Sequence, residues 1–165
     1  KLVSTGSGEL EVKGPGVFLE YWQRPGETAK AFRNGWFRTG DMALNEDGRY
    51  RLLGRTSVDI IKTGGYKVSA LEIEEVLRRH PTIEECAVVG IPDSQWGELV
   101  CVGVELSQGG NLELETLQSW AQEYLAPYKV PRVLRCLQVL PRNAMGKVVK
   151  TDLIAMFESD SKSLG

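Results

Sequence analysis

The chain has 165 residues, of which 42% are hydrophobic and 25% are charged, and its formal net charge is −2. This composition is that of a globular protein with a core, and the small net charge gives no basic excess for binding nucleic acid or an anionic membrane surface. No apolar run approaches the ~18 residues of a membrane-spanning helix. The three separate cysteines and one histidine offer no zinc-ligand spacing, so we expect no metal held by soft ligands, and the cysteine pattern favours a reducing compartment.

The first fifty residues are predicted to be mainly β structure. Residues 8–14 alternate between polar and apolar side chains, as a half-buried strand does, and residues 17–21 predict a second strand that would form a hairpin with it. A short helix is expected to begin at Pro25. Two further strands, at 36–39 and 50–53, flank a turn-forming Asn-Glu-Asp-Gly segment.

Strands and helices alternate after residue 54. Ser69 precedes a helical pattern that places Leu71, Ile73, Val76 and Leu77 on one face, and Glu72 stands where a capping box requires it. His80 follows near the end of this helix, where a cation would favour the helix dipole. The remaining predicted elements are strands at 58–62, 86–90, 99–106 and 133–140 and helices at 112–125 and 151–157.

These elements predict an α+β (α/β-like) fold. We expect a small domain over residues 60–158, with a central β-sheet flanked by helices, after a mainly β strip at 1–53. Residues 54–59 would connect the two as a hinge, because domains joined by a short connector reorient unless their interface is large. Residues 159–165 are predicted to be a polar tail.

Asp41 is the first candidate binding residue. It follows Gly40 near a strand end, where a carboxylate could accept hydrogen bonds from the two hydroxyls of a ribose. Taken alone, the residue is more typical of an aspartate that starts a turn or caps a helix.

A second candidate site surrounds Gly64 and Gly65. Paired glycines let a backbone approach a ligand closely, and the cations Arg55 and Lys67 could meet phosphates. The alternative is an ordinary glycine turn between solvated cations. The segment is not a phosphate-binding P-loop, because the Gly-x-x-x-x-Gly-Lys-Ser/Thr pattern is absent.

The third candidate is Lys147, which ends the loop Pro-Arg-Asn-Ala-Met-Gly-Lys at 141–147. A lysine presented by such a loop could stabilise negative charge that develops during acyl or phosphoryl transfer. The alternative is a solvated surface lysine.

Taken together and in this order, the three segments resemble the last signature segments of adenylate-forming enzymes, the superfamily of acyl-CoA synthetases, luciferases and peptide-synthetase adenylation domains. The resemblance covers residues 8–153. It rests on Gly-Trp-Phe-Arg-Thr-Gly-Asp at 35–41, on Gly-Arg at 54–55 with Asp-Ile-Ile-Lys-Thr-Gly-Gly-Tyr-Lys at 59–67, and on the loop at 141–147.

The resemblance implies an ATP-dependent carboxylate–CoA ligase that uses Mg²⁺, forms an acyl-adenylate and then passes the acyl group to CoA on a second face of a mobile carboxy-terminal domain. It implies that Asp41 binds the ATP ribose, that Arg55 contacts the ribose or phosphates, and that Lys147 stabilises the pentavalent phosphate. The turn from Gly64 to Lys67, with Gly65 and Tyr66, would serve thioester formation.

Three expectations about the parent enzyme also follow from the resemblance. The phosphate loop, the acyl pocket and most ligands of Mg²⁺ would belong to a missing amino-terminal domain of the same chain, so this fragment alone is expected to be inactive. The segments at 55–72, 125–131 and 141–147 are most similar to malonyl-CoA synthetases. This similarity implies that the substrate is malonate or a related short acid and that the enzyme serves lipid metabolism. It also implies a location in the mitochondrial matrix, or otherwise in the cytoplasm.

The sequence departs from the family pattern at one point, and two other functions are also compatible with it. One additional residue separates Arg55 from Asp59 compared with many relatives, so the pivot within Thr56–Asp59 is undetermined by the sequence. The chain could instead be a non-catalytic interaction or CoA-binding module, although all the motif residues are present. It could also be an adenylation domain that loads a carrier protein.

Overall fold

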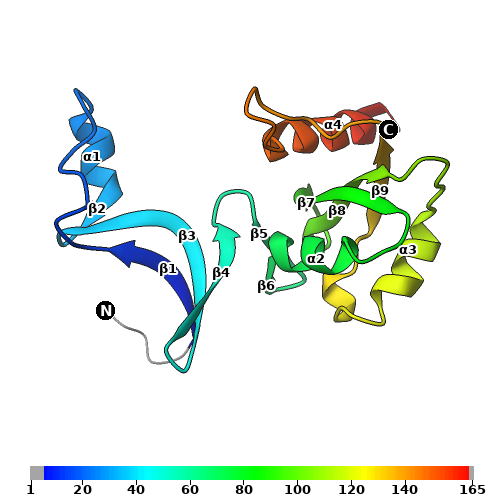
Figure 1. Ribbon diagram of the computed structural model, residues 1–165, viewed down its shortest axis with the longest axis horizontal. Helices are drawn as coiled ribbons and strands as arrows, with labels where there is room; N and C mark the ends of the chain where they lie inside the picture. The colour runs from blue at the N-terminus through cyan, green and yellow to red at the C-terminus, as the bar shows by residue number, and fades with distance from the viewer. Residues whose placement is uncertain (1–5, 164–165) are drawn as a thin grey trace. The chain divides into compact units, whose positions relative to one another are not determined.

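The computed structural model describes the backbone of residues 6–163 and the side chains of residues 6–159. The chain forms two compact units, residues 1–57 and 58–165, each with its own antiparallel or mixed sheet (Figure 1). The α+β class predicted from the sequence is confirmed. No helix within the described range is long and apolar enough to cross a bilayer.

The first unit is a four-stranded antiparallel sheet built around one long strand. Strand β3 pairs with β1 along one edge and with β2 and β4 along the other. Its elements are β1 (Gly6–Val12), α1 (Pro25–Ala31), β2 (Phe32–Arg33), β3 (Trp36–Glu46) and β4 (Arg49–Arg55).

The strand predicted at residues 17–21 is wrong, and so is its hairpin with β1. The backbone N–H of Tyr21 donates to the hydroxyl of Thr28 in α1, so it is not available to a strand. The Phe18 ring packs against Phe37 and Tyr21, with ring centroids 4.9 and 4.8 Å away. The apolar residues of this segment therefore form an aromatic cluster instead of one face of a strand.

The predicted turn before β4 is confirmed. Asp47 and Gly48 have φ values of 51° and 86° between the paired strands β3 and β4. Two consecutive residues with positive φ form the turn that best matches the twist of a two-residue hairpin. The Asn45 side chain accepts a hydrogen bond from the Gly48 N–H and supports this turn.

The second unit contains a five-stranded sheet and three α-helices. The strands follow the order β6–β5–β8–β7, and β9 pairs in parallel with β8. The elements are β5 (Ile60–Thr63), β6 (Tyr66–Ser69), α2 (Ala70–Leu77), β7 (Ile83–Asp93), β8 (Gly97–Leu106), α3 (Leu114–Ala121), the 3₁₀ turn η1 (Pro127–Lys129), β9 (Val133–Leu137) and α4 (Lys150–Ser163). Part of the predicted polar tail thus lies in α4, and residues 164–165 are outside the described range.

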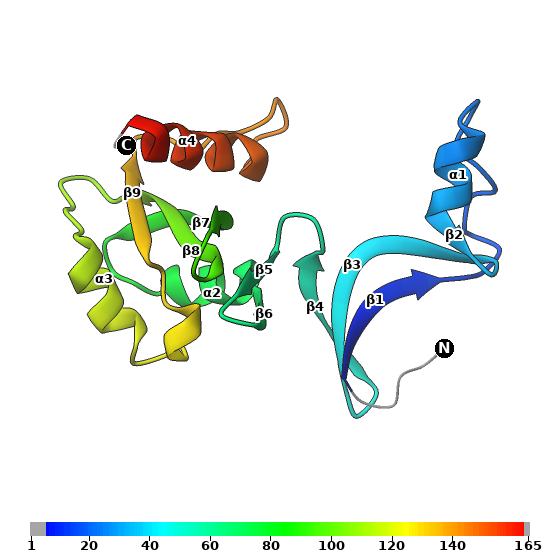
Figure 2. The ribbon, with the colours of Figure 1, turned by 180° about the vertical axis from the view of Figure 1, so that it is seen from behind.

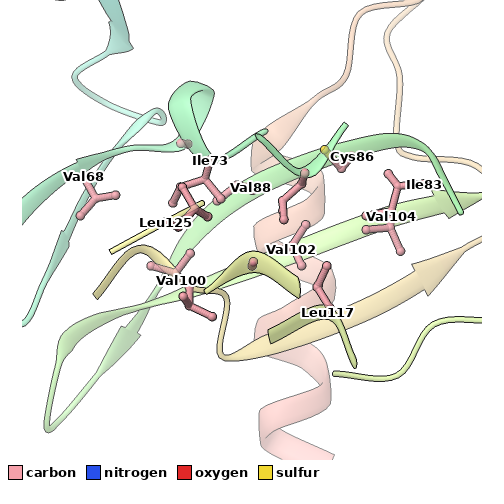
Figure 3. Close-up of a cluster of buried hydrophobic side chains, with 14 of the residues drawn as sticks. Val68, Ile73, Ile83, Cys86, Val88, Val100, Val102, Val104, Leu117 and Leu125 are labelled. Carbon is pink, nitrogen blue, oxygen red and sulfur yellow. The ribbon is translucent and has the colours of Figure 1, made fainter. Parts of the chain in front are cut away.

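Helices cover both faces of this sheet, with α4 on one face and α2 and α3 on the other (Figures 1 and 2). Alternate residues of β7 and β8 point to opposite faces, so Val88 and Val102 join the α2–α3 side (Figure 3) whereas Val89 and Cys101 join the α4 side. This double coverage explains why the two strands are almost continuously apolar.

Helix α2 begins at the predicted cap. The hydroxyl of Ser69 accepts a hydrogen bond from the Glu72 N–H, whereas the Glu72 carboxylate lies 2.7 Å from Lys129 Nζ. The buried face includes Ile73 and Leu77, but Leu71 is 39% exposed, so its predicted place on that face is wrong. Two residues advance a helix by about 200°, which turns Leu71 away from Ile73.

Candidate functional site

The first candidate site joins Asp41 on β3 to Arg55 on β4. The two residues are cross-strand partners, and Arg55 Nε lies 3.0 Å from Asp41 Oδ1. The backbone just before Asp41 is bent, because Gly40 has φ of 77°, and the Asp41 N–H donates to the Thr39 hydroxyl. The structure therefore places both predicted nucleotide-binding residues of the first unit side by side.

The Gly64–Gly65 pair forms the two-residue turn between β5 and β6. Their φ values are 55° and 81°, a conformation that glycine adopts without a steric penalty. The Gly64 N–H donates to the Trp96 carbonyl at 2.9 Å, and a Cβ on Gly64 would lie 3.4 Å from the Trp96 ring. A Cβ on Gly65 would meet no atom within 4 Å. The turn is thus supported at Gly64 and open at Gly65.

The two residues that follow the turn are both exposed. The Tyr66 ring stacks on Tyr128, with centroids 4.2 Å apart and planes 10° apart. Lys67 is exposed and lies opposite Lys62 across the hairpin. Lys129 lies near the same tyrosine pair, but its charge is already paired with Glu72. The exposed surface beside Gly65 therefore combines two stacked aromatic rings with more positive than negative charge.

Neither Tyr128 nor the support from Trp96 was expected from the sequence. Tyr128 lies in the Ala-Pro-Tyr-Lys segment that carries part of the family resemblance. That segment is the sequence feature that could have indicated Tyr128 as part of the site. The position of Trp96 in the β7–β8 turn carries no such sign, because its contact with Gly64 joins residues that are distant in sequence.

Lys147 lies in a tightly closed loop between β9 and α4. The loop is closed by a β-bridge between Arg142 and Val148, and the Asn143 side-chain oxygen accepts hydrogen bonds from the N–H groups of Met145 and Lys147 at 2.9 and 3.0 Å. The Lys147 side chain is exposed. It has no hydrogen bond or ion pair with any residue in the part of the chain that the structure describes.

Arg142 braces this loop from the sheet side. Its guanidinium donates to the Gly146 carbonyl at 3.0 Å and lies 3.0 Å from a carboxylate oxygen of Glu105 on β8. The same Glu105 oxygen accepts a hydrogen bond from the Leu140 N–H. The backbone that presents Lys147 is therefore held before any ligand binds.

The predicted site residues form three groups. Asp41 and Arg55 are adjacent in the first unit. In the second unit, the Gly64–Lys67 turn and the Lys147 loop lie apart, with the loop beside α4 and the turn on the side of α2 (Figures 1 and 2). The second unit thus presents two separate exposed segments that contain predicted site residues.

The prediction that His80 acts as a cation at a helix end is wrong. The side chain is 7% exposed, its ring packs edge-on against Trp120 at 5.1 Å, and its Nδ1 accepts a hydrogen bond from the Thr82 N–H. Burial lowers the pKa of His80, so the neutral imidazole is favoured. Tertiary packing outweighs the helix dipole here.

Cys86 and Cys101 are free, buried thiols of the second unit. Burial raises the pKa of Cys86 and of Cys101 to about 12 in each case, so neither is a thiolate near neutral pH. Among the residues that the structure describes, no group of three or more His, Cys, Asp or Glu side chains could hold a metal ion.

Comparison with known proteins places this architecture in a family. Residues 72–147 match the family model of the AMP-binding enzyme C-terminal domain. The chain is 56% identical over 148 residues to malonate–CoA ligase ACSF3, mitochondrial, of Mus musculus, an alignment that covers 89% of this chain and 25% of that protein. It is 54% identical over 151 residues to the Homo sapiens protein of the same name, with 91% and 26% covered.

A solved structure agrees with these relatives. The crystal structure of ATP-bound MatB from Rhodopseudomonas palustris is 36% identical and superimposes with a TM-score of 0.86, covering 94% of this chain and 31% of that chain. The chain spans about a quarter of the length of the curated relatives that it matches. The chain belongs to the adenylate-forming, AMP-binding enzyme family, and its second unit is a C-terminal domain of that family.

Proposed function

We propose that this chain is the C-terminal part of an ATP-dependent carboxylate–CoA ligase. The observation that carries the proposal is Lys147, an exposed ammonium presented by a loop that Asn143 and Arg142 already hold in shape. The separate open turn at Gly64–Gly65 supports it, because a ligase with two half-reactions needs two sets of contacts.

In the first half-reaction, a carboxylate oxygen attacks the α-phosphorus of ATP and pyrophosphate leaves. Negative charge accumulates on the oxygens of the pentavalent phosphate, and the Lys147 ammonium stabilises that charge. Asp41 accepts hydrogen bonds from the two ribose hydroxyls, while Arg55 orients Asp41 and contacts the ribose or phosphates. Mg²⁺ would neutralise phosphate charge, with ligands from outside these residues.

In the second half-reaction, the CoA thiolate attacks the acyl carbon and AMP leaves. A pantetheine chain is narrow and needs a close approach to the backbone. Gly65 permits this approach because it has no side chain and no other atom lies within 4 Å of its Cβ position. The exposed Lys67 would meet the CoA phosphates, and Tyr66 would line the entry on its Tyr128 support. Residues 54–59 would act as the hinge that exchanges the Lys147 loop for the glycine turn.

Malonate is the proposed substrate, or a related short acid. This choice is supported by the names of the relatives and by sequence identity above 50%. The same relatives carry the word mitochondrial in their names, which supports the mitochondrial matrix as the location. A role in lipid metabolism is part of the proposal through the acyl-CoA product.

The test is pyrophosphate release by the full-length enzyme with ATP, CoA and a panel of acids that includes acetate, malonate and octanoate. We expect selective turnover of malonate. Preference for a monocarboxylate would keep the ligase and reject malonate. Turnover that requires a carrier protein in place of CoA would favour a carrier-loading enzyme, and no turnover of any acid would favour a non-catalytic module.

A further inference from the structure

Lys150 occupies a position that local helix preferences disfavour. It is the first residue of α4, where the positive end of the helix dipole favours acidic side chains. Its side chain is nevertheless only 13% exposed. A largely buried residue that opposes local helix preferences is usually held in place by tertiary contacts, and such positions are often functional.

Two carboxylates hold the Lys150 ammonium. Its Nζ lies 2.6 Å from Asp59 Oδ1 and 2.7 Å from Glu74 Oε1. Glu74 has 4% of its side chain exposed, and the same oxygen accepts a hydrogen bond from the Val88 N–H at 2.8 Å. One cation therefore joins the start of α4 to α2, to β7, and to the residue just before β5.

Asp59 is itself fixed by the backbone. Its carbonyl accepts a hydrogen bond from the Ala70 N–H at 2.7 Å, at the start of α2. Asp59 is also the last residue of the proposed hinge. The contact with Lys150 thus ties α4 to the point where the second unit leaves that hinge.

The Lys147 loop depends on where α4 begins. Only Val148 and Val149 separate Lys147 from Lys150, and the Val149 N–H donates to the Pro141 carbonyl at 2.7 Å, next to the Arg142–Val148 bridge. A shift of Lys150 would therefore move the backbone that carries Lys147.

We infer that Lys150 is a positioning residue for the adenylation half-reaction: by pairing with Asp59 and Glu74 it fixes the Lys147 loop to the hinge end of the second unit. The inference rests on the proposed function. Rotation at the hinge would then carry the loop as a rigid body, so that Lys147 reaches the phosphate in one defined place. Lys150 itself touches no reacting atom.

The experiment uses the full-length enzyme and separates the two half-reactions. Adenylate formation is followed as a single-turnover burst of pyrophosphate from ATP and malonate without CoA, and acyl transfer is followed from prepared acyl-adenylate and CoA. We expect Lys150→Met to slow adenylate formation by about 10- to 100-fold, because small misplacements of a reacting group have effects of that size. Acyl transfer should stay within about threefold.

Two variants and one further readout separate positioning from general stability. Lys150→Arg keeps the cation and should restore adenylate formation to within about threefold of wild type. Arg135→Met removes a cation that donates to the Met156 carbonyl farther along α4, and should spare adenylate formation. Hydrogen exchange at residues 141–149 should accelerate in Lys150→Met and not in Arg135→Met.

The inference is overturned if adenylate formation is unchanged in Lys150→Met, or if both half-reactions are slowed equally. It is also overturned if Lys150→Met and Lys150→Gln fail to fold while Lys150→Arg folds normally, because Lys150 would then serve stability alone. If wild type forms no adenylate from any acid, the proposed function itself fails. If wild type is active and Lys147→Ala is impaired while Lys150→Met is not, only the role of Lys150 fails.

Discussion

Arg55 Nε lies 3.0 Å from Asp41 Oδ1, so the two residues proposed to bind one nucleotide are also bound to each other. They face each other across the β3–β4 hairpin. Arg55 is 63% exposed and Asp41 30% exposed, and exposed ion pairs contribute only about 0–1 kcal/mol to stability. The pair is therefore better suited to orienting a carboxylate for a ligand than to holding the hairpin together.

Asp41→Ala is expected to raise the KM for ATP of the full-length enzyme by about 10- to 100-fold, since a hydrogen bond to a charged group contributes ~1.5–3 kcal/mol. Its free energy of unfolding should change by less than about 1 kcal/mol. Glu46→Ala is the matched control, because the Glu46–Arg51 pair at 4.0 Å is an exposed ion pair of the same hairpin. An equal rise in KM in both variants would contradict the role of Asp41.

Lys147→Ala should slow adenylate formation by about 100- to 1,000-fold, the range seen when one group that stabilises transition-state charge is removed. Acyl transfer from preformed adenylate to CoA should be nearly unchanged, and the unfolding temperature should stay the same because the side chain is exposed. Arg79→Ala, which removes another exposed cation of the second unit, serves as the control. Equal losses in both half-reactions would rule out the assignment.

Gly65→Ala tests the second half-reaction. Gly65 has φ of 81° and Gly109 has φ of 79°, and a Cβ added at either position would meet no atom within 4 Å. Both Ala variants should therefore lose about 1 kcal/mol of stability from backbone strain. Only Gly65→Ala should slow acyl transfer to CoA, because its methyl group would occupy the path of the pantetheine chain. Similar transfer rates in the two variants would remove Gly65 from the proposed site.

Local sequence patterns predicted the elements whose structure is set by nearby residues. The Asp47–Gly48 turn and the Ser69 cap were found because turn and cap chemistry acts over two to four residues. The segment at 17–21 was misassigned because Phe18 packs against Phe37, a contact that spacing within the segment does not encode. The same limit hid the burial of His80 against Trp120.

For the candidate site, the family resemblance supplied the residues and the structure supplied their neighbours. Lys147 was singled out by its loop, but its brace from Arg142 and Glu105 joins residues 37 positions apart. The sequence carries no sign of the role of Lys150, because a single lysine at the start of a helix is common and its two carboxylate partners, Asp59 and Glu74, are distant in sequence. Contacts of this kind depend on the complete fold and leave no pattern in a short stretch of sequence.

His80 leads to a prediction about pH. Burial lowers the pKa of His80 in the folded state below its usual value near 6.5, so at mildly acidic pH the unfolded state binds the extra proton more readily. The contribution of His80 to stability is therefore fully present above about pH 6.5 and is lost as the pH falls below that value. Protonation of Nδ1 would also remove the acceptor for the Thr82 N–H.

The measurement is the free energy of unfolding of the full-length enzyme between pH 8 and pH 5, in wild type and in His80→Phe. Phenylalanine keeps a ring against Trp120 but does not titrate, so its stability should decline less steeply below pH 6.5, although it starts lower because the Thr82 N–H loses its partner. Other titrating groups are common to both proteins and cancel in the difference. Parallel curves would mean that His80 takes up its proton equally well in the folded and unfolded states, and that its buried contacts with Trp120 and Thr82 do not favour the neutral ring.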